Sequence, residues 1–114
     1  MVESVLVVDD DPAFRERIVA FLADQFPDRE VVQVGDGNSA LTSALDLRPR
    51  HVLLDVAMPG PDGLRVANAL AQALPATHIV ILSGADAPVD LPAGAGFVRK
   101  DEAMEDRLRE LLAV

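Results

Sequence analysis

Five short apolar runs rich in valine, isoleucine and leucine alternate along this chain with segments of helical periodicity. Short apolar runs of this kind are typical of strands buried on both faces, and strands that alternate with helices build a parallel sheet covered by helices. We therefore expect an α/β fold, doubly wound around a five-stranded parallel sheet. The predicted strands are Ser4 to Val8, Glu30 to Val34, His51 to Leu54, His78 to Leu82 and Gly96 to Arg99.

Four segments have the spacing of apolar residues that a helix lying on a sheet requires. The first is expected to begin at Pro12, with Asp11 as its N-cap, because aspartate is a preferred cap and proline suits the first helical position. It should end between Ala23 and Phe26. The other helices are predicted near Asn38 to Leu47, near Leu64 to Leu74, and after a cap at Asp101.

The connection between the fourth and fifth strands, Gly84 to Ala95, contains Pro88, Pro92 and Gly94 and has little apolar periodicity. A crossover needs about 10 to 12 residues including its helix, so the length allows one, but proline and glycine disfavour a regular helix. We predict a loop with at most one short helical turn here. The fourth helix is therefore expected to be short or absent.

Length and composition limit the kinds of protein that this chain can be. With 114 residues it is expected to form a single domain over residues 1–114, without a separate output domain. A net charge of -9 disfavours direct nucleic-acid binding, which depends on lysine and arginine. No apolar stretch approaches the ~18 residues of a membrane span, and the N-terminus lacks the basic start of a signal peptide, so we expect a cytoplasmic protein without a membrane partner.

Chemically reactive side chains follow four of the five predicted strands. They are Asp9, Asp10 and Asp11 after the first strand, Asp55 after the third, Ser83 after the fourth and Lys100 after the fifth. Lys100 is the only lysine in the chain, which has nine arginines. Ligands of open parallel sheets bind at the carboxyl ends of the strands. If the second strand lies at the edge, the four reactive ends become neighbours. The order 2-1-3-4-5 of one class of doubly wound sheets has this property, and we predict that order.

These residues lie in four motifs: VLVVDDDP at residues 5 to 12, LLDVAMPGPDG at 53 to 63, ILSG at 81 to 84 and GFVRK at 96 to 100. Together and in this order, the motifs resemble the receiver (REC) domains of two-component response regulators, which have a flavodoxin-like fold similar to that of chemotaxis regulators. The resemblance covers essentially the whole chain.

The resemblance implies a phosphoacceptor and a Mg²⁺ site. By analogy, Asp55 accepts a phosphoryl group to form an aspartyl phosphate. Asp10, Asp55 and the backbone carbonyl of Ala57 would bind Mg²⁺ directly, and Asp9 would act through a water molecule. The roles agree with the chemistry, because a carboxylate can be a nucleophile, but its attack on an anion needs a hard cation to offset the charge.

The resemblance also implies a phosphate-binding and switching set. Lys100 and Ser83 would contact the phosphoryl oxygens, and Ser83 and Phe97 would be the switch residues. Implied partners are a sensor histidine kinase or phosphotransfer protein and a downstream effector protein or detached output domain, with a weak homodimer through the family's signalling face. The protein would catalyse its own phosphorylation and dephosphorylation without being an enzyme in the usual sense.

Two other interpretations fit part of the pattern. Asp9-x-Asp11 after a strand also occurs in phosphatases of the haloacid dehalogenase type, but Ala13 replaces the threonine or valine of that motif. A degenerate receiver used only for protein contacts would not need the intact set of Asp9, Asp10, Asp55, Ser83 and Lys100. One departure from the receiver pattern is that Asp101, instead of proline, follows Lys100. We expect no cis peptide bond there, because a non-proline cis bond costs ~2.5 to 4 kcal/mol.

Overall fold

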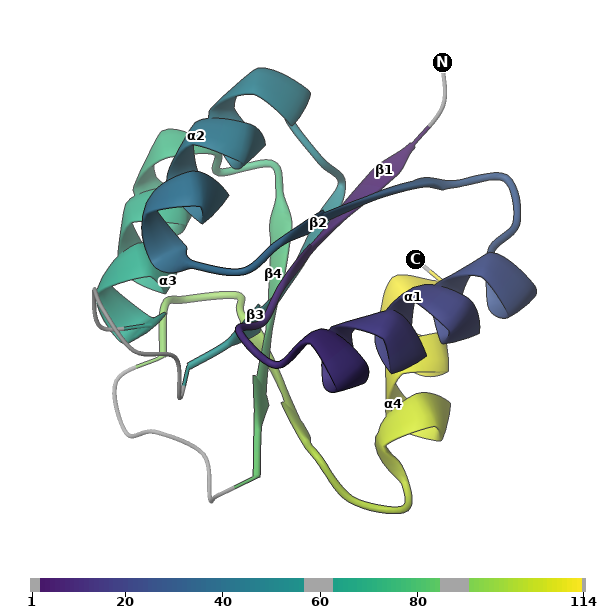
Figure 1. The fold of residues 1–114 in the computed structure, drawn as a ribbon. Coiled ribbons are helices and arrows are strands. Elements are labelled where there is room, and N and C mark those ends of the chain that lie inside the picture. Colours follow the sequence, from purple (N-terminus) through teal and green to yellow (C-terminus); the bar gives the residue numbers. More distant parts are fainter. Residues whose placement is uncertain (1–2, 57–62, 85–90, 114) are drawn as a thin grey trace.

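Five parallel strands form a single sheet in a computed structural model, which describes residues 3–56, 63–84 and 91–113 (Figure 1). The strand order is β2-β1-β3-β4-β5, as predicted. The strands match the sequence-based ranges, except that β3 and β4 each extend one residue further at their carboxyl ends. Their bounds are β1 Ser4–Val8, β2 Glu30–Val34, β3 His51–Asp55, β4 His78–Ser83 and β5 Gly96–Arg99.

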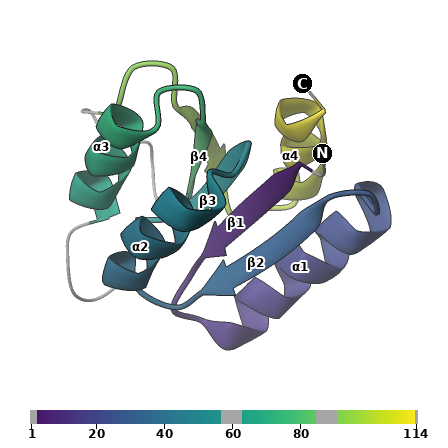
Figure 2. The same cartoon turned by 90° about the horizontal axis from the view of Figure 1, so that it is seen from above.

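Helices cover both faces of the sheet, with α2 and α3 on one side and α1 and α4 on the other (Figures 1 and 2). Alternate side chains of the buried strands point to opposite faces, so the core has two halves. One half contains Leu6, Val52 and Ile81 of the strands, and the other contains Val5, Leu53 and Val80. The helices are α1 Pro12–Gln25, α2 Gly37–Leu47, α3 Gly63–Ala73 and α4 Met104–Leu112.

The helix caps confirm one sequence prediction and correct another. The carboxylate of Asp11 accepts hydrogen bonds from the backbone N–H groups of Ala13 and Phe14, so Asp11 caps α1 as expected. Asp101 does not cap α4 directly, because that helix begins at Met104 and its N-cap residue is Ala103. The Asp101 side chain instead accepts from the Ala103 N–H, in the turn that precedes the helix.

The connection between β4 and β5 agrees with the prediction as far as it is described. Residue 84 and residues 91–95 are not helical, while residues 85–90 lie outside the described part of the chain. β5 follows this connection and places Phe97 beside Ile81 of β4. In the described residues there is no cis peptide bond, which includes the bond between Lys100 and Asp101.

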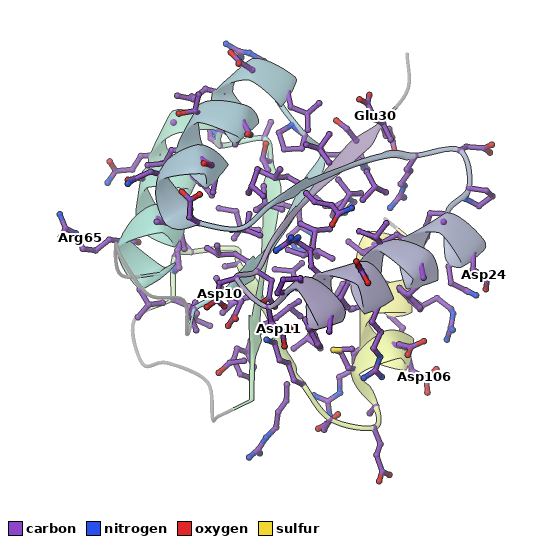
Figure 3. The ribbon with its side chains drawn as sticks, in the orientation of Figure 1. Asp10, Asp11, Asp24, Glu30, Arg65 and Asp106 are labelled. Atoms are coloured by element: carbon purple, nitrogen blue, oxygen red, sulfur yellow. The ribbon has the colours of Figure 1, made fainter. Side chains whose placement is uncertain are left out.

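All strands run in the same direction, so their carboxyl ends meet at one edge of the sheet. Figure 3 shows Asp10 and Asp11 where β1 leads into α1, with Glu30 at the opposite end of the sheet. Within the described parts of the chain, none of the helices combines the length and the apolar character needed to cross a membrane. The carboxyl edge of the sheet brings together Asp9, Asp10 and Asp55, with Ser83 and Lys100 at the neighbouring strand ends.

Candidate functional site: an acidic cluster bridged by lysine

Three carboxylates gather at the carboxyl edge of the sheet. Asp9 and Asp10 follow the last residue of β1, and Asp55 is the last residue of β3, the strand beside β1. Each of the three offers an oxygen atom, and these oxygens lie within 4.8 Å of one another. Asp9 and Asp55 are buried at 1% and 4% exposure, whereas Asp10 is exposed.

The ammonium group of Lys100 bridges the two buried carboxylates. Its Nζ atom lies 3.1 Å from Asp9 Oδ2 and 3.3 Å from Asp55 Oδ2. The Lys100 backbone is fixed as well, because its N–H donates to the carbonyl of Ser83 at 2.8 Å. The single lysine thus partly neutralises a cluster that would otherwise hold three repelling charges.

Burial nevertheless raises the pKa of the Asp9 carboxyl above its usual value. The hydrogen bond from the Asp11 N–H and the charge of Lys100 act in the opposite direction, and the charge of Asp55 raises the pKa further. A raised pKa means that folding disfavours the ionised form, so the Asp9 charge costs stability at neutral pH and less so below the ordinary pKa of 3.8. In the absence of a metal ion, the site is therefore a source of instability.

Asp9→Asn should stabilise the metal-free domain, because it removes the buried charge and keeps an oxygen to accept from the Asp11 N–H. We expect this gain as a melting temperature above that of the wild type. Asp10→Asn is the matched control: Asp10 belongs to the same cluster but is exposed, so its gain should be smaller. An Asp9→Asn protein that melts at or below the wild-type temperature without metal would contradict this account.

The donor set fits a hard divalent cation. Mg²⁺ takes oxygen ligands at about 2.0 to 2.1 Å in octahedral geometry, so two opposed ligand oxygens are separated by about 4.2 Å. Oxygens within 4.8 Å of one another are close to that separation. Ala57, whose carbonyl was predicted as a further ligand, lies outside the described residues.

Ser83 and Phe97 lie on the strands next to the acidic cluster. Ser83 ends β4, one residue beyond Leu82, the register partner of Asp55 on β3, and is 5% exposed. Phe97 lies on the outer strand β5, where it is half-buried and packs against the core half under α2 and α3. The two predicted switch residues therefore lie on β4 and β5, the strands that follow β3 toward one edge of the sheet.

Two residues that the motifs did not single out contact the site. The Arg15 guanidinium donates to the Asp9 backbone carbonyl at 2.6 Å and, through Nε, to Gln33 at 3.2 Å. The ring of Phe14 lies against the Lys100 ammonium group. Both residues lie in the first turn of the helix that follows the aspartates, and this position is the sequence signal that could have indicated their contact with the site. Helical spacing alone would assign Phe14 to the core.

The fold and site together define a class: flavodoxin-like α/β domains with an acidic cluster at the carboxyl ends of the strands. The protein-family model described as "Response regulator receiver domain" matches residues 5–111 of the chain. The chain therefore belongs to the response regulator receiver domain family and is the receiver domain of a two-component response regulator.

Curated relatives and solved structures agree with this assignment. The chain is 37% identical over 114 residues to the "DNA-binding response regulator MtrA" of Mycolicibacterium smegmatis, covering 99% of this chain and 49% of that protein. It is 36% identical over 121 residues to the "Glycerol metabolism activator" of Pseudomonas putida, covering 95% and 53%. The crystal structure of the Vibrio cholerae chemotaxis protein CheY4 superposes with a TM-score of 0.82 at 27% identity, covering 100% of this chain and 99% of that one. The chain spans about half the length of these curated relatives.

Proposed function

We propose that this domain is a phosphorylation-operated switch in which Asp55 accepts a phosphoryl group from a histidine kinase or phosphotransfer protein. The observation that carries the proposal is the environment of the Asp55 carboxylate. It is buried beside the carboxylates of Asp9 and Asp10 and touches the Lys100 ammonium at 3.3 Å. A structural carboxylate would not need two further acids and a lysine at the same strand ends.

The chemistry assigns a role to each side chain. A carboxylate oxygen of Asp55 forms the new bond to phosphorus, while the bond from phosphorus to the donor's imidazole nitrogen breaks and the imidazole leaves. Asp10 and Asp55 would hold Mg²⁺ directly and Asp9 through a water molecule, and the bound ion would offset negative charge on the reacting groups. Lys100 places its ammonium against the phosphoryl oxygens, and the Ser83 hydroxyl donates to another of them.

The output would be a change in a protein-binding surface. A hydrogen bond from Ser83 to the phosphoryl group would draw the end of β4 toward Asp55 and change the packing of Phe97 on the neighbouring strand. The effector would be another protein or an output domain, and a weak homodimer would use the same surface. Phosphorylation and binding of the effector would take place in the cytoplasm, and this domain would make no direct contact with nucleic acid or membrane.

Mass spectrometry after incubation with acetyl phosphate and Mg²⁺ tests the proposal. We expect one labile phosphoryl group on the wild type, none on Asp55→Asn and little on Asp9→Asn. Asp46→Asn is the control, because Asp46 is an exposed carboxylate on α2, away from the site. Labelling that survives Asp55→Asn would refute the proposal. Steady turnover of a phosphomonoester would instead indicate a phosphatase.

A further inference from the structure

The aromatic ring of Phe14 lies under the Lys100 ammonium group. The Nζ atom is 4.0 Å from the centre of the ring, well inside the ~6 Å over which a cation is attracted to an aromatic face. We propose that Phe14 is a positioning residue, which holds the Lys100 ammonium over the acidic cluster. The inference rests on the proposed function, because it concerns the lysine that would contact the phosphoryl group.

The local structure fixes the ring in this place. Phe14 belongs to the first turn of α1, and its backbone N–H, like that of Ala13, donates to the capping carboxylate of Asp11. Its side chain is half-buried and packs against the core half formed with α1 and α4. The ring face is therefore presented to Lys100 by a capped helix and a packed core rather than by a mobile loop.

Lys100 needs such a contact because its other partners lie in the reacting cluster. A lysine side chain is a flexible four-carbon stem, and the ammonium contacts of Lys100 among the described residues are Asp9, Asp55 and the Phe14 ring. A divalent cation on the two carboxylates would neutralise them and weaken their attraction for the ammonium. The attraction of the ring does not depend on the charge of the carboxylates.

A second position for the Lys100 ammonium group lies outside the acidic cluster. A cavity of about 460 Å³ adjoins Phe14 and Lys100, and the exposed acids Asp101 and Glu102 line it. Without the aromatic face, these carboxylates would compete for the lysine and draw it away from Asp55. Phe14 therefore selects between two positions of the same side chain.

The single lysine makes the position of its side chain directly measurable. Protein with isotope-labelled lysine gives side-chain NMR signals from Lys100 alone, because the chain has no other lysine. We expect ring-shifted, upfield signals of the lysine ε-methylene protons in the wild type, with and without Mg²⁺. Phe14→Tyr should keep them, and Phe14→Leu, which retains apolar packing, should lose them.

Phe26→Leu is a matched control. Phe26 is also half-buried, packs against the same core half and lies under a cation, Arg29, at 4.4 Å, but it is at the far end of α1. This variant should keep the shifted Lys100 signals. Signals at unshifted positions in the wild type, or shifted signals that persist in Phe14→Leu, would overturn the proposal.

The rate of phosphorylation by acetyl phosphate and Mg²⁺ is the second measurement. Phe14→Leu should be slower by about fivefold, the factor expected for one cation–π contact, while Phe14→Tyr and Phe26→Leu should keep the wild-type rate. A wild-type rate in Phe14→Leu would overturn the inference. If the wild type itself is not phosphorylated, the proposed function fails, and the lysine spectra still show whether the Phe14 ring lies against the Lys100 side chain and keeps this contact when Mg²⁺ is added.

Discussion

Replacing Gly63 by alanine should destabilise the domain by about 3 kcal/mol, a large fraction of the ~5 to 15 kcal/mol that holds such a domain together. Gly63 is the buried first residue of α3, and a Cβ atom there would lie 2.5 Å from the Val56 Cα and 2.9 Å from the Val56 carbonyl oxygen. These are backbone atoms, so no rotamer change relieves the overlap. Because Val56 directly follows Asp55, relief requires movement of α3 or of the carboxyl end of β3.

Urea denaturation followed by far-ultraviolet circular dichroism measures the loss, since the chain has neither tryptophan nor tyrosine for intrinsic fluorescence. Gly84→Ala is the matched control, because a Cβ at the exposed Gly84 would meet no atom within 4 Å. Gly84→Ala should leave the free energy of unfolding nearly unchanged. Two variants of equal stability would show that the close approach of Gly63 to Val56 does not limit packing. Phosphorylation of Asp55 should also slow in Gly63→Ala.

The sheet could be predicted from the sequence because its determinants are local. Buried strands appear as continuous apolar runs, and each run is bounded by residues that end a strand or cap a helix, as Asp11 does. The strand order could be predicted because one known class of doubly wound sheets has β2 at the edge, which makes the reactive strand ends neighbours. The start of α4 was placed too early because Asp101 resembles a cap in sequence, whereas its carboxylate is used in the preceding turn.

The composition of the site was predictable, but the contacts within it were not. The resemblance gives Asp10 a direct and Asp9 a water-mediated role toward Mg²⁺, but it does not indicate that the fold buries Asp9 and leaves Asp10 exposed. The contacts of Phe14 with Lys100 and of Arg15 with Asp9 depend on how α1 leaves the sheet, a three-dimensional feature that spacing does not encode. The chemical roles of the site residues, with that of the Ala57 carbonyl, and the single-domain organisation stay predictions.

A second titrating site lies at the opposite end of the sheet. His51, the first residue of β3, is 1% exposed, and its Nδ1 atom has no hydrogen-bond partner among the described residues. Its ring packs edge-on against that of His78 on β4, with 5.3 Å between the ring centres. Burial, followed by the charges of Arg29, His78 and Arg50, lowers the pKa of His51 from 6.5 to about 4.

Stability should therefore fall as the pH falls from 6.5 to about 4. In this window the unfolded chain binds a proton at His51 and the folded protein does not, so the free energy of unfolding rises with pH and its His51 contribution is complete above 6.5. The expected contribution is about 3 kcal/mol, because each unit of pKa shift corresponds to about 1.4 kcal/mol.

His51→Leu tests this prediction, because leucine fills the buried position without titrating. Urea denaturation of the wild type and of His51→Leu at a series of pH values should show a steep fall below pH 6.5 in the wild type and a shallower one in the variant. The difference between the two curves isolates His51 from the carboxylates, which titrate in both proteins. His78→Gln is a second control, since it removes the half-buried neighbour and leaves the buried imidazole in place. Parallel curves for the wild type and His51→Leu would show that His51 is not held neutral by the fold.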